Sequence, residues 1–249
     1  MLIFLDTANI DEIREMAKLG VIDGVTTNPS LMAKMGRTDY RNVTQEVCYL
    51  VQGPVSAEVI STDAEGMVEE TLKIAQWSPH VAVKIPFIEE GLEALKTLRG
   101  RHANRETICS GCPWLGKCAT PLEKAREVVT EKPIQFNVTL IFSANQALLA
   151  AKAGAAYVSP FIGRLDDAGN DGMRVIREIR TVFDNYGFQT KILTASVRHP
   201  MHLVEAAVIG SDVATVPYAV LKKAIRHPLT DAGLKAFVHD WKQVEAQQQ

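Results

Sequence analysis

The chain has little that would suit it to nucleic acid or to a membrane. Its 27 Lys and Arg residues are offset by 29 Asp and Glu residues, and the basic residues are spread along the chain rather than gathered in a stripe. No segment approaches the roughly 20 apolar residues of a membrane helix. The N-terminus has no basic start and reaches Asp6 too early for a signal peptide. We therefore expect a small-molecule partner, no nucleic acid, no membrane and a cytoplasmic location.

Cysteines and glycine-rich turns are also scarce. Four Cys in 249 residues are too few for the disulfide framework of an exported protein, so they indicate reduced thiols or a metal site. The first apolar run is followed by DTANID, which has no Gly and therefore argues against the phosphate-binding turn of a doubly wound sheet. No Pro/Ser linker or low-complexity tract divides the chain. We expect one domain over residues 1–249.

Short β-branched and apolar runs predict eight strands. They lie at residues 2–6, 22–27, 54–60, 81–86, 134–141, 156–162, 190–196 and 212–217. Helical periodicity fills most of the intervals, at residues 10–20, 63–76, 89–100, 143–154 and 172–187. Eight βα units in about 250 residues match an α/β fold closed into a single (β/α)₈ TIM barrel.

Helix ends and one irregular spacing refine this prediction. Ser61 or Asp63 and Ser143 are candidate N-caps, and Gly20, Gly154 and Gly187 are candidate C-caps. The helix predicted at 89–100 leaves residues 101–133 as an inserted, Cys-containing segment between the fourth helix and the fifth strand. Residues 228–249 predict one further, C-terminal helix.

Polar side chains gather where the predicted strands end, which is where (β/α)₈ barrels carry their chemistry. They are Asp6, Thr26, Asn28, Glu58, Lys84, Asn137, Thr139, Ser159, Thr194 and Ser196. Lys84 lies inside the apolar run VAVKIP, where an ammonium group must reach water, pair with a carboxylate or lose its proton. A neutral amine can attack a ketone and form a Schiff base.

Each of these residues also has an ordinary interpretation. Lys84 alone could be solvated, Asp6 could cap the helix that begins near Asn9, and Thr139 and Ser159 could satisfy backbone groups. Their convergence on one end of the barrel favours a site. Arg164 and Arg198, together with Ser196, follow the sixth and seventh strands, where this fold commonly holds a phosphate.

An ordered series of motifs extends this pattern along the chain and resembles the small-subunit transaldolase family. The motifs are LDTAN (5–9), GVTTNPSL (24–31), AEV (57–59), VKIP (83–86), NVTLIFSANQALLAAKAGA (137–155), VSPFIGRLDD (158–167), ASVRHP (195–200) and DVATVP (212–217). The resemblance implies transfer of a dihydroxyacetone unit between sugar phosphates with no cofactor for catalysis, in the setting of the pentose phosphate pathway. It also implies a homo-oligomer, a pentamer or decamer, with the C-terminal helix at its contacts.

The resemblance further implies roles for particular residues. Lys84 matches the Schiff-base lysine and Asp6 the carboxylate that handles the substrate hydroxyl, while Glu58 and Thr139 match the pair that holds the catalytic water. The predicted substrate-binding residues are Asn28, Asn137 and Ser159 around the dihydroxyacetone portion, Arg164, Ser196 and Arg198 around the phosphate, and in addition Thr26 and Phe161.

Three other functions stay open. Fructose 6-phosphate aldolase resembles this sequence but has Gln in place of Glu58 and Tyr in place of Phe161, so both positions favour the transaldolase interpretation. A transaldolase acting on a sulfonated sugar would use the same arginines. A catalytically silent sugar-phosphate-binding protein would be expected to lack Lys84, Asp6 or Glu58, and this chain has all three.

The inserted segment departs from the family pattern and carries Cys109, Cys112 and Cys118. The spacing C-x₂-C-x₅-C brings three soft ligands within ten residues and suggests a structural metal. His102 would complete a zinc site, and Cys48 would instead complete an iron–sulfur cluster. The alternative is a helical hairpin with reduced cysteines. Either way, the insertion is expected at the N-terminal face of the barrel, away from the chemistry.

Overall fold

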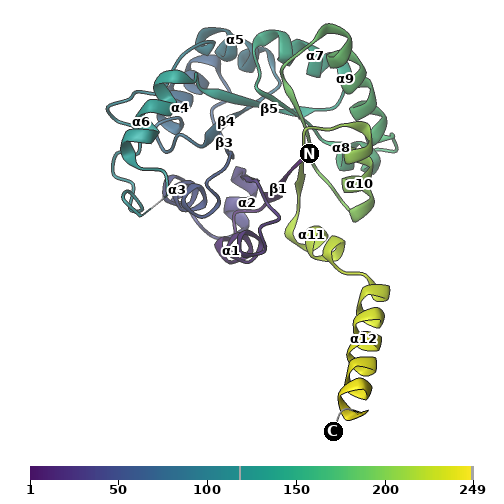
Figure 1. Cartoon of the computed structure of the whole chain (residues 1–249). Coiled ribbons are helices and arrows are strands. Elements are labelled where there is room, and N and C mark those ends of the chain that lie inside the picture. Colours follow the sequence, from purple (N-terminus) through teal and green to yellow (C-terminus); the bar gives the residue numbers. More distant parts are fainter. Residues whose placement is uncertain (118, 248–249) are drawn as a thin grey trace.

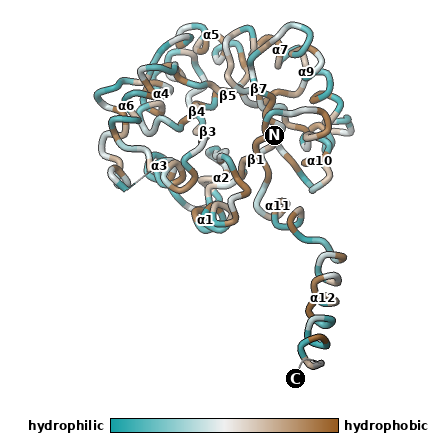
Figure 2. The backbone as a smooth tube through the Cα atoms, in the orientation of Figure 1, coloured by the Kyte–Doolittle hydropathy of each residue, from teal (hydrophilic) through white to brown (hydrophobic). Residues whose placement is uncertain are grey.

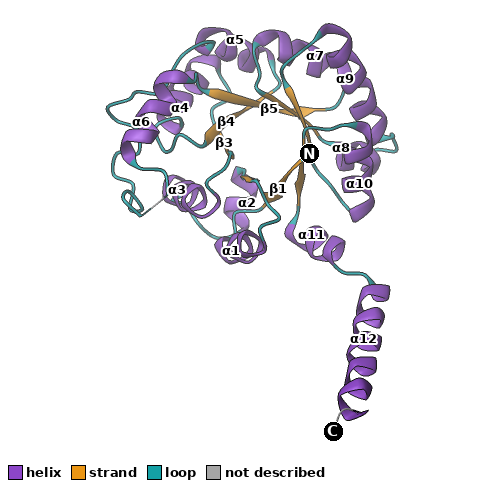
Figure 3. Ribbon diagram, in the orientation of Figure 1, coloured by secondary structure: helices purple, strands orange, loops and turns teal. Residues whose placement is uncertain are grey.

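The eight strands pair in parallel and in chain order, and the last pairs with the first to close a barrel (Figure 3). The computed structural model describes residues 1–117 and 119–247. The strands are β1 (Leu2–Asp6), β2 (Gly24–Thr26), β3 (Val55–Glu58), β4 (Val81–Pro86), β5 (Gln135–Ile141), β6 (Tyr157–Pro160), β7 (Lys191–Thr194) and β8 (Val213–Val216). Each lies within a predicted run, so the predicted (β/α)₈ barrel is confirmed.

Helices surround the barrel and connect successive strands (Figure 1). They are α1 (Ile10–Leu19), α2 (Pro29–Lys34), α3 (Tyr40–Val51), α4 (Ala64–Ile74), α5 (Glu89–Leu98), α6 (Leu122–Glu131), α7 (Ala144–Ala153), α8 (Ile162–Asp167), α9 (Gly172–Tyr186), α10 (Pro200–Ile209), α11 (Tyr218–Ile225) and α12 (Pro228–Gln247). Most strand residues are buried because helices cover the outer face and side chains fill the interior.

Capping residues fix where the helices begin. Asp63 and Ser143 accept backbone N–H groups of α4 and α7, as predicted. The Asn9 side chain accepts the N–H groups of Asp11 and Glu12 and so caps α1. Asp6 is therefore not the cap of that helix, and its carboxylate is available elsewhere. Glycines in the left-handed conformation end α1, α7 and α9 at the three predicted positions.

Two short helices, α2 and α8, follow β2 and β6 directly and had no periodic signal long enough to predict them. Gly163 in α8 donates its N–H to the carbonyl of Ser196, and a Cβ at Gly163 would lie 2.1 Å from that oxygen. Only glycine fits this close approach. The loop after β6 is therefore held against the loop after β7, which brings Arg164 and Arg198 to the same rim.

The fifth strand is not regular. Its pairing with β6 shifts register between Val138 and Ile141, and Leu140 has a φ of 58°. The bulge turns Leu140 into the cavity at the C-terminal end of the barrel. Strict alternation would have placed it on the opposite face from Asn137 and Thr139.

The inserted segment leaves α5 after Leu98, runs through turns, and reaches α6, so it starts slightly earlier than predicted. It packs beside the start of β4, where Cys109 donates its N–H to the carbonyl of Gln76. Ile108 is fully buried in this contact. The insertion therefore lies at the N-terminal end of the barrel, as expected.

The last helix, α12, projects away from the barrel (Figure 1). Figure 2 shows apolar residues along it, and Leu229, Phe237 and Trp241 are among its exposed side chains. Among the described residues, no helix is both long and apolar enough to cross a membrane.

Candidate active site

A cavity of about 540 Å³ opens at the C-terminal ends of the strands. Its lining takes at least one side chain from every strand of the barrel: Asp6, Thr26, Glu58, Lys84, Leu140, Ser159, Leu193 and Thr215. This volume lies within the range of small-molecule sites, about 300–1,000 Å³. The barrel therefore concentrates polar groups from distant parts of the sequence around one space.

Lys84 and Glu58 form the central ion pair of this cavity. The Lys84 Nζ lies 3.0 Å from Glu58 Oε2, and the two side chains are only 6% and 15% exposed. The pair follows from strand register, because Glu58 on β3 lies opposite Lys84 on β4, and Lys84 lies opposite Asn137 on β5. The ion pair places the Lys84 amine, the predicted nucleophile, beside a carboxylate in the cavity wall.

Asp6 is held by a chain of hydroxyl groups. Thr26 Oγ1 donates to Asp6 Oδ1 at 2.7 Å and lies 2.6 Å from Thr215 Oγ1. Burial raises the pKa of Asp6, and the Thr26 hydrogen bond and the positive charges of Lys84 and Lys34 offset only part of that shift. A carboxyl group tuned upward in this way exchanges its proton more readily near neutral pH, as acid–base catalysis requires.

The buried side-chain amide of Asn137, on β5, links β3 and β6 by hydrogen bonds. Ser159 Oγ donates to Asn137 Oδ1 at 2.6 Å, and Asn137 Nδ2 donates to Ser56 Oγ at 3.0 Å. These bonds fix the orientation of the Asn137 amide beside Lys84. Asn28 also lines the cavity, and its Oδ1 caps α2 by accepting the N–H of Leu31, which leaves its amide nitrogen outside the cap.

Thr139 is not among the residues that line the cavity. Its side chain is fully buried, and within the described part of the chain its hydroxyl has no hydrogen-bond partner. Buried polar atoms in proteins are nearly always bonded to protein or to an ordered water. This hydroxyl lies on β5, which pairs with the strand that carries Lys84.

Positive charge occupies the rim. Arg164, Ser196 and Arg198 all line the cavity, and the Arg164 guanidinium lies 4.9 Å from the centre of the Phe161 ring. Arg198 donates to Asp167 at 2.6 Å and is half exposed. Ser196 has a left-handed backbone, with a φ of 63°. The two arginines give this part of the rim a positive charge, which suits the predicted binding of an anion.

The structure brings ten of the twelve predicted catalytic and substrate-binding residues to the cavity wall. They are Asp6, Thr26, Asn28, Glu58, Lys84, Ser159, Phe161, Arg164, Ser196 and Arg198. Asn137 and Thr139 lie buried behind that wall. Their chemical roles stay predictions, because position alone does not assign a role.

Sequence reasoning missed three residues that contribute to this region. Tyr40 on α3 accepts the backbone N–H of Glu58 at 2.7 Å, and burial raises the pKa of Tyr40 to about 12. Lys34 lines the cavity, and Thr215 extends the hydroxyl chain to Asp6. Thr215 alternates with the apolar residues of DVATVP, a signal that could have placed it inside the barrel. Tyr40 had no such signal, because only tertiary packing brings it to β3.

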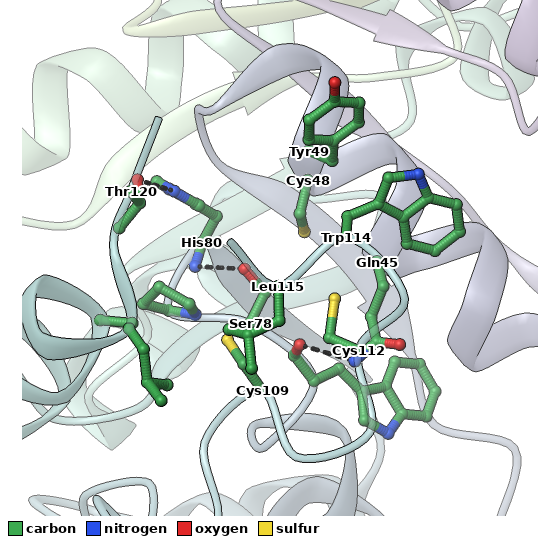
Figure 4. A pocket seen from close by; sticks show the side chains of 14 residues that line it. Gln45, Cys48, Tyr49, Ser78, His80, Cys109, Cys112, Trp114, Leu115 and Thr120 are labelled. Atoms are coloured by element: carbon green, nitrogen blue, oxygen red, sulfur yellow. Dashed lines mark hydrogen bonds between the residues drawn. The ribbon is translucent and has the colours of Figure 1, made fainter. Parts of the chain in front are cut away.

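The predicted metal ligands lie elsewhere. Cys48, Cys109 and Cys112 line a second, smaller cavity at the N-terminal end of the barrel (Figure 4). Burial raises the pKa of the Cys48 thiol to about 12. His102 does not line this cavity, and its Nδ1 lies 3.0 Å from the carbonyl oxygen of Val129. Cys118 lies outside the described residues.

A buried lysine paired with a carboxylate at the C-terminal end of a (β/α)₈ barrel defines a class of protein, the barrel enzymes that act through a lysine Schiff base. Residues 3–248 match the family model of transaldolase/fructose-6-phosphate aldolase, and the chain belongs to this family. The family predicted from the sequence motifs is thus confirmed.

Three relatives are similar to this chain over nearly its full length. Proteins named "probable transaldolase" from Geotalea uraniireducens strain Rf4 and Methanococcus maripaludis strain C7 are each 49% identical to it. They cover 98% and 97% of this chain and 99% and 97% of their own lengths. A third of the same name, from Thermoanaerobacter sp. strain X514, is 50% identical over 97% of each chain.

Proposed function

We propose that the protein is a transaldolase that transfers a dihydroxyacetone unit from a ketose phosphate to an aldose phosphate. The observation that carries this proposal is the buried ion pair of Lys84 and Glu58 within a cavity that also holds Asp6. The family and the names of the relatives support the same activity.

The reaction would use these side chains in sequence. The Lys84 amine attacks the C2 carbonyl of the donor, and loss of water from the carbinolamine leaves an imine. Glu58, with a water held near Thr139, moves the protons that this dehydration requires. Asp6 takes the proton of the C4 hydroxyl as the C3–C4 bond breaks, so an aldose phosphate leaves and an enamine stays on Lys84. The acceptor aldehyde then reacts with the enamine, and the steps reverse.

The residues beside Lys84 favour transfer of the dihydroxyacetone unit to an acceptor over its release as free dihydroxyacetone. The Lys84 Nζ lies 5.9 Å from the centre of the Phe161 ring, which has no hydroxyl to position a water against the imine. Glu58 is likewise the transaldolase residue of the resemblance. Sedoheptulose 7-phosphate or fructose 6-phosphate would be donors, and a sulfonated sugar would fit the arginine rim by the same charge pairing.

Borohydride trapping tests the nucleophile. Reduction of the protein in the presence of fructose 6-phosphate should attach the dihydroxyacetone unit to Lys84, seen by peptide mass analysis. Lys84→Met should carry no label and lose activity, whereas Lys96→Met, an exposed lysine on α5, should behave as the parent. A label on another lysine would contradict the mechanism.

A second measurement separates transaldolase from aldolase. With fructose 6-phosphate and erythrose 4-phosphate, the rate of transfer should be well above the rate at which free dihydroxyacetone appears without an acceptor. Comparable rates would assign the protein to the aldolase branch while leaving the lysine chemistry intact.

The domain organisation, location and oligomeric state of the enzyme are also proposals. We infer a single domain acting in the cytoplasm within the pentose phosphate pathway, as the resemblance implies. The exposed apolar residues of α12, with Phe237 at 73% exposure, support a homo-oligomer in which this helix packs on a neighbouring subunit. Light scattering of the intact chain should give a pentamer or decamer, and a monomer would refute it.

A further inference from the structure

The loop between β7 and α10 carries Arg198 and is held in place at several points. Ser196, in the same loop, has a left-handed backbone with a φ of 63°, which is costly for a residue other than glycine. Gly163 of α8 donates its N–H to the Ser196 carbonyl, and the Arg198 side chain donates to Asp167 of α8 at 2.6 Å. Strained backbone persists where surrounding contacts over-determine it. The place of Arg198 at the cavity rim therefore depends on contacts outside the cavity.

One further contact comes from a buried histidine in the first turn of α10. His202 Nδ1 accepts the backbone N–H of Arg198, with the two nitrogens 3.3 Å apart, and the His202 side chain is only 7% exposed. The other ring nitrogen, Nε2, lies 3.2 Å from Asp166 Oδ2 on α8. One imidazole thus contacts both segments that carry the rim arginines, the loop with Arg198 and the helix with Arg164.

These two contacts determine which ring nitrogen carries the proton. A nitrogen that accepts a hydrogen bond is unprotonated, so we assign the ring proton to Nε2, which faces Asp166. Burial lowers the pKa of His202, and the neighbouring His199 lowers it further. The charges of Asp166 and Glu205 act in the opposite direction, and that of Arg198 again lowers the pKa. The neutral ring that the Arg198 contact requires is therefore favoured at neutral pH.

Neighbouring groups restrict the orientation of the imidazole. Asp166 Oδ1 accepts the N–H of Gly172 at 2.9 Å, which ties this carboxylate to the start of α9. The ring of His199 packs on the ring of His202, with the centres 3.7 Å apart. The contact between His202 and the loop is therefore supported from α8, α9 and α10 together.

The ordinary interpretation of His202 is a helix cap. The N-cap of α10 is His199, so His202 is the third residue of the helix, and the third residue of a capping box also bonds back to a backbone N–H. In a capping box that N–H belongs to the N-cap residue. His202 instead bonds the residue before the N-cap, Arg198, which lines the cavity. The bond therefore acts on the rim as well as on the start of the helix.

From this arrangement we propose that His202 is a positioning residue that holds Arg198 in the geometry that binds the phosphate of the substrate. His202 does not line the cavity, so it acts through Arg198 rather than by contact with the substrate. The proposal rests on the proposed function for the identity of the anion. Binding of an anion to the rim does not itself require catalysis, so the two can be tested separately.

Two substitutions separate hydrogen bonding from packing. His202→Leu keeps much of the side-chain volume and removes the acceptor, whereas His202→Asn loses volume but places an amide oxygen where Nδ1 was. The probe is sulfate, whose binding to the intact chain is measured by calorimetry near neutral pH. Because a displaced Arg198 loses about one charge-assisted hydrogen bond, the Kd for sulfate should rise about tenfold in His202→Leu. In His202→Asn it should stay within about threefold of the parent.

Steady-state kinetics provide a second measurement. With fructose 6-phosphate as donor, the KM should follow the Kd for sulfate, and turnover at saturation should stay within about twofold because no group beside Lys84 changes. His227→Ala is the matched control. His227 Nδ1 also accepts a backbone N–H, that of Leu229, but this residue is exposed and does not line the cavity. It should change neither quantity.

If His202→Leu fails to fold, His202→Gln carries the test, because its amide can still reach Asp166 but leaves no acceptor at the Nδ1 position. It should raise the Kd for sulfate by the same factor. Unchanged sulfate binding in these variants, with only a lower melting temperature, would overturn the proposal and leave His202 as a helix cap. So would a larger loss of affinity in His202→Asn than in His202→Leu, or a parent protein that binds no sulfate. Failure of the proposed function would appear separately, as the absence of borohydride trapping at Lys84.

Discussion

The two ends of this barrel are built from the same strands and differ in chemistry. At the C-terminal ends of β3 and β4, Glu58 and Lys84 form a buried ion pair beneath a wide, charged cavity. At the N-terminal end of β4, Ser78 and His80 border a narrow cavity walled by thiols and aromatic rings. The C-terminal end must admit a substrate and hold charged groups in fixed positions, whereas the N-terminal end needs only stable packing.

One helix contacts both ends. Tyr40, at the start of α3, accepts the N–H of Glu58, and Cys48, two turns later, borders the thiol cavity. The Tyr40 ring also packs edge-on against Trp77, with the centres 5.5 Å apart. The comparison therefore predicts that substitutions at the charged end change activity, that those at the thiol end change stability, and that Tyr40 changes both.

The largest effect on activity among these tests is expected for Asp6→Asn. Loss of a positioned acid–base group costs about 10²–10⁴-fold in turnover. Because the pKa of Asp6 is raised in the folded protein, ionising it costs stability as pH rises from about 3.8 through the raised value. Asp6→Asn should therefore raise the melting temperature at pH 7, and this gain should vanish below pH 3.8.

Thermal melts across pH, alongside turnover, check this prediction. Asp11→Asn, an exposed carboxylate in the first turn of α1, is the matched control and should change neither quantity noticeably. A destabilised Asp6→Asn at neutral pH would mean that the carboxylate is needed for packing rather than tuned for catalysis.

Arg164→Ala should have the next largest effect. Removing a charge-assisted hydrogen bond to phosphate costs about 1.5–3 kcal/mol, which is about 10–160-fold in binding. The KM for phosphorylated donors should rise by that factor, and dihydroxyacetone-type substrates without phosphate should be little affected. Steady-state kinetics with both kinds of substrate provide the measurement.

Arg174→Ala removes the same charge from the exposed face of α9 and serves as the control. Equal losses for phosphorylated and unphosphorylated substrates in Arg164→Ala would refute the anion-binding role of the rim.

Tyr40→Phe should have a smaller effect, on both turnover and stability. The change leaves the buried N–H of Glu58 without its acceptor, at a cost of about 1–3 kcal/mol. We expect a several-fold loss of turnover as Glu58 shifts relative to Lys84, together with a lower melting temperature. Tyr186→Phe, on an exposed ring, controls for loss of a phenol. Stability loss with unchanged turnover would show that α3 does not position Glu58.

The smallest effect on activity is expected for Ile108→Ala at the thiol end. Ile108 is 2% exposed, so truncating it should cost about 2–5 kcal/mol of the free energy of unfolding. Turnover at 25 °C should stay within about twofold of the parent as long as the protein remains folded. Chemical denaturation and kinetics on the same samples test this, and a large loss of turnover in folded protein would show that the two ends are coupled.

Local sequence determined much of this protein. The eight apolar runs specified the strands, because β-branched residues favour a pleated, buried backbone. Asn9, Asp63 and Ser143 fixed helix starts through hydrogen bonds that span only a few residues. Lys84 within an apolar run, and carboxylates at other strand ends, indicated where the chemistry lies, because strand ends converge once a barrel closes.

Tertiary structure alone decided the rest. The bulge at Leu140, the contact of Tyr40 with Glu58, and the close approach at Gly163 depend on register and packing between segments far apart in the sequence. The same holds for Cys48, which meets Cys109 and Cys112 only because the insertion docks on α3. Residue spacing carries local hydrogen bonding and periodicity, but the distance between side chains on different elements is set when the barrel closes and its loops pack.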